Sequence, residues 1–242
     1  MAARLLDPRS RRNSLPLQKG FLEANGATLP GRCTTDAFDV FVDGAGELLV
    51  VALRTLGRGA ADPELPGAAL DVARGAVDNG ARTYEIVREL RDYCVGREAE
   101  LAFALLRFSQ SESRVELLNA GMPAFVCVLP DGRTALHSAL SSAIGTRYGE
   151  VHPYELSPLV WGSTWFFMTS GATQGALDGA AVEAHLARHE LDRVGSLLAM
   201  QPSDALLPII DSLAGGSNLE GDATLIVVST DAARRKRSGI LT

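Results

Sequence analysis

Apolar and polar positions along the chain predict short strands interrupted by a few helices. Two apolar runs, at 39–43 and 48–53, flank the glycine-containing segment 44–46, and this arrangement is typical of a β-hairpin. Apolar residues at helical spacing between 70 and 90 predict one long helix, or two helices joined near Asn79-Gly80. Further strands are expected at 101–108, 114–119, 125–129, 134–138, 165–169 and 223–229, and further helices at 182–187, 194–199 and 205–213.

This order of elements favours an α+β protein. Strands and helices do not alternate regularly along the chain, so a doubly wound parallel sheet is not expected. Packed antiparallel sheets with flanking helices agree better with a helical stretch set between two groups of strands. The sequence shows no internal repeat and no change of composition that would mark a second domain.

Composition and charge exclude several classes of function. The net charge is −6, and the segments 1–19 and 231–242 each carry a net positive charge, so the body between them is acidic and we expect no nucleic-acid partner. No apolar run approaches the length of a membrane span, which predicts no membrane partner. The 3 cysteines form no CxxC pair, so neither a disulfide framework nor a zinc ribbon is expected. Together these features favour a cytoplasmic protein.

Five short motifs occur at the ends of expected strands. The first is an Asp-x-x-Asp pair that leads into an apolar run, and the second is an apolar run that ends in Arg-Thr-Leu-Gly-Arg-Gly. The third is an Asn-Ala-Gly-Met-Pro turn, the fourth a strand that ends in Thr-Ser-Gly, and the fifth Gly-Asp-Ala-Thr before the final strand. In order they are residues 36–39, 54–59, 119–123, 169–171 and 221–224.

These motifs, in this order, resemble the metal-dependent serine/threonine protein phosphatase superfamily (PPM), in its bacterial SpoIIE-like branch. The resemblance covers residues 32–230. It implies a four-layer αββα sandwich of two mostly antiparallel β-sheets flanked by helices. Outside it we expect an N-terminal extension, residues 1–31, that is basic at its start and partly disordered, and a basic C-terminal tail, residues 231–242.

The resemblance also implies where the family's metal ligands would stand. Three of those positions hold residues that are not acids, namely Arg54, Ser170 and Gly221. The acids that match the family pattern are Asp36, Asp39 and Asp222. Two divalent ions need several carboxylate oxygens, so we expect no catalytic residues, no bound metal and no other cofactor.

The leading hypothesis is therefore a catalytically inactive phosphatase, a pseudophosphatase, that acts as a regulatory protein-binding module. We expect Asp36 to pair with Arg54. The former cleft, with Arg54, Arg58 and Asp36, is a candidate site for a phosphate or another anion, because guanidinium groups match phosphate well. The expected partner is a phosphoprotein of a bacterial partner-switching pathway or a homologous phosphatase-fold protein. A homodimer is a further alternative. The alternative for Arg54 and Arg58 is that they are surface or ion-paired residues with no ligand.

Two other functions remain as alternatives. An active but divergent Mn²⁺- or Mg²⁺-dependent phosphatase would need ligands from the three retained acids together with Asp43 or Glu47. The second alternative is a structural subunit of a larger assembly, in which the fold would serve only as a contact surface for other subunits. A zinc site at His185 and His189, one helical turn apart, is less favoured than a solvated helix face, because the segment lacks the glutamate of the His-Glu-x-x-His pattern.

Overall fold

The computed structural model describes most of the chain outside its two ends. The described residues are 17–57, 59, 62–145, 153–176, 178–191, 198–201, 203–216 and 219–230. The basic segments 1–16 and 231–242, the side chain of Arg58 and most of the helix expected at 194–199 lie outside them.

Within these residues the strands form two sheets in which every neighbouring pair is antiparallel. The six-stranded sheet has the order β1 (Leu17–Lys19), β2 (Leu22–Leu29), β11 (Ala223–Thr230), β10 (Thr164–Met168), β7 (Phe125–Val128) and β8 (Thr134–His137). The five-stranded sheet has the order β3 (Asp36–Val42), β4 (Leu48–Leu56), β5 (Glu100–Ser109), β6 (Arg114–Ala120) and β9 (Glu155–Pro158).

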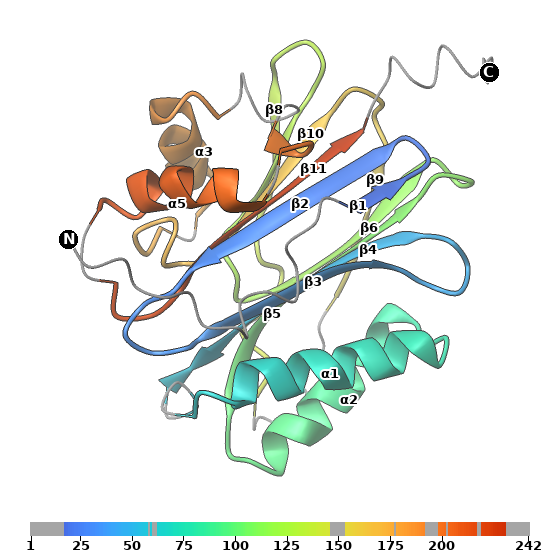
Figure 1. The fold of residues 1–242 in the computed structure, drawn as a ribbon. Helices are drawn as coiled ribbons and strands as arrows, with labels where there is room; N and C mark the ends of the chain where they lie inside the picture. Colours follow the sequence, from blue (N-terminus) through green and yellow to red (C-terminus); the bar gives the residue numbers. More distant parts are fainter. Residues whose placement is uncertain are drawn as a thin grey trace.

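Helices cover the outer face of each sheet (Figure 1). Helices α1 (Leu65–Asp78) and α2 (Thr83–Val95) lie on the five-stranded sheet, and α3 (Gly179–Arg188) and α5 (Leu207–Leu213) lie on the six-stranded sheet. A 3₁₀ turn, η3 (Ser203–Leu206), leads into α5. The four-layer αββα sandwich expected from the sequence is thus confirmed. The helical stretch expected between 70 and 90 is two helices, and the chain turns between them at Gly80, whose φ of +77° suits glycine.

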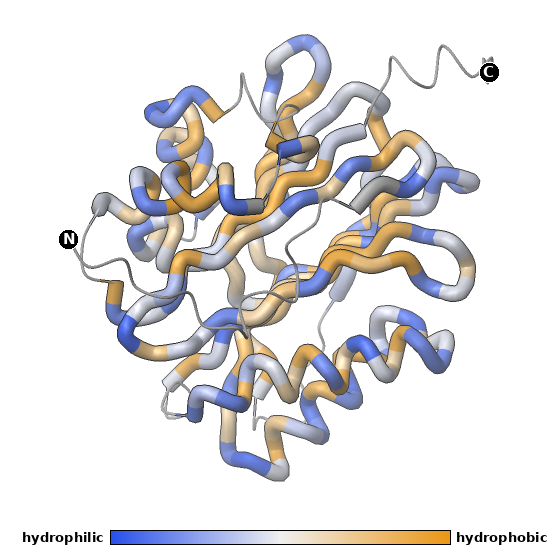
Figure 2. The backbone as a smooth tube through the Cα atoms, in the orientation of Figure 1, coloured by the Kyte–Doolittle hydropathy of each residue, from blue (hydrophilic) through white to orange (hydrophobic). Residues whose placement is uncertain are grey.

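Three apolar layers hold the sandwich together. One lies between the two sheets and includes Phe108 and Trp165. The other two lie between each sheet and its own helices. Because β4 has a neighbouring strand on each side and contributes to two of these layers, six consecutive residues from Leu48 to Leu53 are buried. Figure 2 shows hydrophobic positions running along the strands, whereas α1 and α2 alternate between hydrophobic and hydrophilic positions.

Strands β1, β2 and β9 were not among the predicted elements. Residues 17–29, placed in the expected N-terminal extension, form β1 and β2, and β2 pairs with β11 at eight positions. The polar residues Glu23 and Asn25 interrupt the apolar pattern of β2, so the sequence does not predict a strand there. Both residues are nevertheless buried. The amide of Asn25 donates hydrogen bonds to the carbonyls of Leu198 and Gln201, which explains how it is tolerated there.

Among the helices of the described residues, none combines the length and the apolar character needed to cross a lipid bilayer.

Candidate functional site

The first and second motifs meet at one end of the sandwich through an ion pair. Asp36 begins β3, and Arg54 stands directly opposite it near the end of β4. Arg54 Nη1 lies 3.1 Å from Asp36 Oδ1 and 3.0 Å from the carbonyl oxygen of Asp222, and it donates to both. The side chain of Asp36 is fully buried and that of Arg54 is 16% exposed. The expected ion pair of Asp36 with Arg54 is therefore present.

The carboxylate of Asp222 holds the connection between β2 and β3. Its Oδ1 accepts the N–H of Gly31 at 2.9 Å, and its Oδ2 accepts the N–H groups of Thr35 and Asp36 at 2.9 and 3.2 Å. A carboxylate that accepts three backbone donors is well satisfied where it is. Asp222 thus contributes its carbonyl oxygen to Arg54 and uses its carboxylate to position the loop.

Threonine hydroxyls complete the hydrogen bonding around the buried Asp36 carboxylate. Thr35 Oγ1 donates to Oδ1 at 3.1 Å and accepts the backbone N–H of Asp222, and Thr224 Oγ1 donates to Oδ2 at 3.0 Å. Thr28 lies 2.9 Å from the Thr224 hydroxyl, and Thr169 accepts the backbone N–H of Thr224. Thr169 and Thr224 belong to the fourth and fifth sequence motifs, whereas Thr28 lies in β2, a strand that the sequence analysis did not predict.

Burial raises the pKa of the Asp36 carboxyl to about 6, even though Arg54 and a hydrogen bond from Thr169 favour the ionised form. Desolvation is the larger effect because water does not reach this carboxylate. The Asp36 side chain is therefore part of the protein interior and is not accessible from solvent.

Gly221 borders the same ion pair, and Ser170 lies in the turn that follows β10. A Cβ atom on Gly221 would lie 2.7 Å from Arg54 Nη2 and 2.8 Å from Thr35 Oγ1. Ser170 follows β10 in a tight turn, in which its carbonyl oxygen accepts the N–H of Gly175. The three positions that the resemblance identified as former metal ligands are thus a guanidinium, a turn residue and a position without a side chain.

Asp39 does not belong to this site. It lies three residues along β3 from Asp36, so its side chain points to the opposite face of the sheet, toward α1. There it forms an ion pair with Arg74, and burial raises the pKa of its carboxyl. Asp43 and Glu47 lie in the β3–β4 turn, at the far end of the hairpin from Asp36 and about 20 Å away along the strand. These acids therefore cannot join Asp36 around one metal centre.

The third motif is a structural turn. Asn119 Oδ1 accepts the N–H of Met122, and its amide donates to the carbonyl of Pro123. Gly121 has a φ of +77°, and a Cβ there would lie 2.9 Å from the backbone nitrogen of Ala143. The buried Met122, where the family pattern has histidine, packs in the layer between the sheets.

The residues present do not fit a pair of Mg²⁺ or Mn²⁺ ions. Asp36 Oδ1 and the Asp222 carbonyl both accept hydrogen bonds from the guanidinium of Arg54. Within the described ranges, no three His, Cys, Asp or Glu side chains come together in a way that could bind a metal ion. At position 54, where the family pattern has a metal ligand, this chain therefore has a guanidinium cation that is hydrogen-bonded to Asp36 and to the Asp222 carbonyl.

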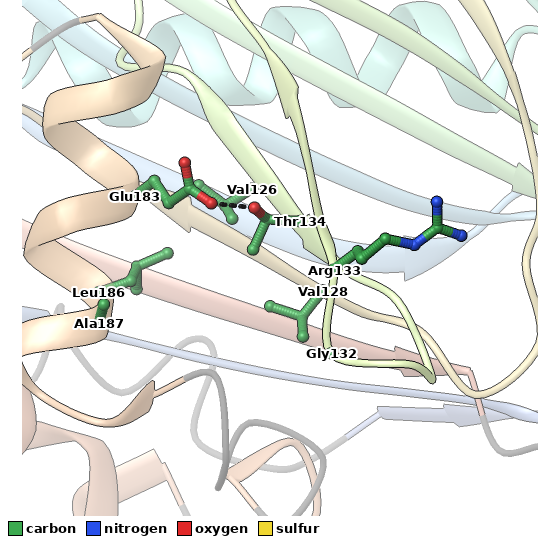
Figure 3. A pocket seen from close by; sticks show the side chains of 8 residues that line it. All are labelled: Val126, Val128, Gly132, Arg133, Thr134, Glu183, Leu186 and Ala187. Carbon is green, nitrogen blue, oxygen red and sulfur yellow. Dashed lines mark hydrogen bonds between the residues drawn. The ribbon is translucent and has the colours of Figure 1, made fainter.

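A separate cavity of about 470 Å³ lies between the β7–β8 hairpin and α3 (Figure 3). Its walls are Val126, Val128, Leu186 and Ala187, and Glu183 accepts a hydrogen bond from Thr134 across it. It opens on the outer face of the six-stranded sheet, away from Asp36, and its one carboxylate is already engaged. We assign no chemistry to it.

The histidine pair at the C-terminal end of α3 is partly buried and does not form a solvated face. His185 is 2% exposed, and its Nε2 lies 3.0 Å from the carbonyl oxygen of Ala172. The ring of His189 lies 5.1 Å from that of His185. The expectation of a solvated face was wrong for His185, because α3 rotates this residue toward the turn that follows β10.

Comparisons with known proteins agree with this fold. The family model of Stage II sporulation protein E (SpoIIE) matches residues 46–231. A structure of the RsbU and RsbW domains of a Mycobacterium tuberculosis protein is similar at a TM-score of 0.68 and 18% identity, over 90% of this chain and 64% of that one. The PP2C phosphatase domain of SpoIIE from Bacillus subtilis, with a fragment of its regulatory domain, is similar at a TM-score of 0.66 and 14% identity, over 87% and 62%.

A structure of RsbX in complex with magnesium is similar at a TM-score of 0.63 and 15% identity, over 89% of this chain and 98% of that one. The chain thus spans less than two thirds of the first two structures. No curated protein matches the sequence. At these identities the similar structures show the fold alone.

Proposed function

The chain belongs to the SpoIIE family, and on that premise we propose that it is a pseudophosphatase: a phosphatase fold that binds a protein partner without hydrolysing phosphate. The observation that carries this proposal is the position of Arg54. Its guanidinium binds Asp36 and the Asp222 carbonyl at the point where the family pattern has a ligand for divalent ions.

Electrostatics supports the loss of metal chemistry. A single and a double positive charge about 4 Å apart repel by roughly 8 kcal/mol at an effective dielectric constant of about 20. Arginine stays charged at every pH at which the protein is folded, so this repulsion is permanent. The oxygens that remain around Arg54 are too few and too well satisfied to offset it.

The same guanidinium supports binding of an anion. The hydrogen bonds of Arg54 within the described residues use Nη1, and the side chain is partly exposed. We propose that its Nε and Nη2 groups, which donate no hydrogen bond among the described residues, bind a phosphate oxygen, because a guanidinium matches phosphate oxygens with favourable geometry. Arg58 lies four residues further on and is part of the proposed site by sequence alone. The ligand we propose is phosphoserine or phosphothreonine on a protein.

The similar structures support a role in signalling. One of them contains the RsbU and RsbW domains together, and another is described under the bacterial stressosome, a modular system adapted to control secondary messenger signaling. By analogy we propose a protein partner in a bacterial partner-switching pathway, and a cytoplasmic location for this chain. A homologous phosphatase-fold protein and a second copy of this chain are the other partners to test.

The test combines turnover with binding. The wild-type chain is incubated with p-nitrophenyl phosphate and with a phosphoserine peptide at millimolar Mn²⁺, and Mn²⁺ and both forms of the peptide are titrated calorimetrically. We expect no turnover, no heat from Mn²⁺, and binding of the phosphorylated peptide only. Arg54→Met should weaken that binding by roughly tenfold or more, since a charge-assisted hydrogen bond is lost.

Arg133→Met is the matched control, because Arg133 is exposed and pairs with Asp131 in the β7–β8 turn. It should leave peptide binding unchanged. Metal-dependent turnover that Asp36→Ala abolishes would overturn the proposal in favour of the active phosphatase. A fixed partner that co-purifies, without peptide binding, would favour the structural subunit.

A further inference from the structure

The guanidinium of Arg54 lies directly against Gly221, where there is no room for a side chain. A Cβ atom added to residue 221 would lie 2.7 Å from Arg54 Nη2, well inside the distance of an ordinary contact. The second nearest atom, Thr35 Oγ1, is held in place by its hydrogen bonds to Asp36 and Asp222. The guanidinium therefore occupies space that any side chain at 221 would need.

The guanidinium also connects the two sheets. Asp36 and Arg54 belong to the five-stranded sheet, whereas the Asp222 carbonyl immediately precedes β11 of the six-stranded sheet. Thr224, within β11, donates to the other oxygen of Asp36. One cation and one buried carboxylate thus join β3, β4 and β11 at this end of the sandwich.

From this geometry we infer that Arg54 and Gly221 are a compensating pair, in which the guanidinium is a resident cation that joins the two sheets and the glycine makes room for it. The inference rests on the proposed function, because it interprets two departures from the family pattern as one exchange. Position 54 gains a positive charge and position 221 loses its side chain. The domain then carries its own cation and needs no divalent ion for its stability.

A buried carboxylate requires such a partner. Asp36 is fully buried, and removal of the cation beside it would leave a charge without compensation, which destabilises proteins strongly. Thr35 and Thr224 satisfy hydrogen bonds of this carboxylate but bring no positive charge. The resident cation is therefore a structural requirement of this end of the sandwich.

A double-mutant cycle in thermal unfolding tests the pair. The variants are Arg54→Met, Gly221→Ala and the two combined, each measured with EDTA and with Mn²⁺. We expect Arg54→Met to lower Tm by roughly 5–10 °C and Gly221→Ala by roughly 4–8 °C. The Tm of the combined variant should fall by clearly less than the sum of the two single decreases. The reason is that Arg54 Nη2, the atom nearest to the new methyl group, is absent from the combined variant.

Gly44→Ala is the matched control for the glycine substitution. Gly44 lies in the exposed β3–β4 turn, and a Cβ there would meet nothing within 4 Å. Its effect on Tm should be small and should add to that of Arg54→Met. Additive losses for Arg54→Met and Gly221→Ala would overturn the inference.

Arg54→Lys tests the charge itself and keeps the experiment decisive if a Gly221 variant does not fold. Lysine keeps the positive charge and methionine does not, so Tm should be higher for the lysine variant by about 3 °C or more. Equal Tm values for the lysine and methionine variants would overturn the inference that Arg54 acts as a resident cation. Failure of the proposed function would be seen separately, as Mn²⁺-dependent turnover or an Mn²⁺-induced rise in Tm of the wild-type chain.

Discussion

Asp39 of β3 and Arg74 of α1 form an ion pair with 2.5 Å between Oδ2 and Nη1, on the face of the sheet opposite to Asp36. Asp36 and Asp39, three residues apart on β3, thus form their ion pairs on opposite faces of the five-stranded sheet. Asp36 joins the two sheets to each other, and Asp39 joins the five-stranded sheet to its helix. A strand directs residues i and i+3 to opposite faces, so an Asp-x-x-Asp pair on a regular strand cannot act as a single pair of ligands.

Asp39→Asn should lower the free energy of unfolding by about 1 kcal/mol or less, because the side chain of Arg74 is 51% exposed and solvent screens the pair. Asp36→Asn should cost about 2–4 kcal/mol, since it leaves a largely buried guanidinium without its carboxylate. Urea denaturation measures both. Phosphopeptide affinity should be unchanged in Asp39→Asn, and a loss of affinity there would place Asp39 in the site after all.

Asp222→Asn should destabilise the chain by about 2–4 kcal/mol. The carboxylate accepts three backbone N–H groups on its two oxygens, and an amide would turn one of those acceptors into a donor. Urea denaturation is again the measurement. The control is Asp131→Asn, in an exposed turn, which should leave the free energy of unfolding almost unchanged because solvent screens its ion pair with Arg133. Equal effects of the two substitutions would show that the β2–β3 connection does not depend on Asp222.

The three thiols should differ sharply in reactivity. Burial raises the pKa of Cys94 to about 12 and that of Cys127 to about 11, whereas Cys33 is exposed. Thiolates are the reactive form, so a disulfide reagent at pH 8 should modify one thiol per folded chain and three per unfolded chain. Cys33→Ser should remove the rapid reaction. Two or more rapidly reacting thiols in the folded chain would contradict the burial of Cys94 or Cys127.

His185 should make the fold less stable in acid. Burial lowers its pKa below the ordinary value of 6.5, and the neutral ring donates through Nε2 to the Ala172 carbonyl and accepts from Arg188 at Nδ1. The unfolded chain then binds a proton more readily than the folded chain, so the contribution of this residue to stability falls as the pH drops through 6.5. The difference in unfolding free energy between wild type and His185→Gln should therefore be smaller at pH 5.5 than at pH 7.5. A constant difference would show that the ring is protonated equally in both states.

The order of the elements predicted packed antiparallel sheets with flanking helices, and the resemblance to the phosphatase superfamily supplied their four-layer arrangement. The apolar runs of β4, β5 and β11 are long and bounded by turns, so their identity follows from local pattern. Strand β2 was not predicted because its interior holds Glu23, Asn25 and Gly26, which are buried only through contacts distant in sequence.

Part of the site was predictable in the same way. The pairing of Asp36 with Arg54 follows from the register of one hairpin, which motif spacing already suggests. The roles of Thr224 and Gly221 depend on the approach of β11 from almost two hundred residues away, and no local pattern predicts that approach. The face to which Asp39 points could have been found from strand periodicity alone.

The position of β11 has a consequence for biosynthesis. This strand lies between β2, near the start of the sequence, and β10, and it pairs with both along most of its length. While the chain is being made, β2 and β10 are both synthesised before the strand that belongs between them. The six-stranded sheet therefore cannot close until translation has passed Thr230, and the nascent chain holds an open gap that a chaperone is suited to protect.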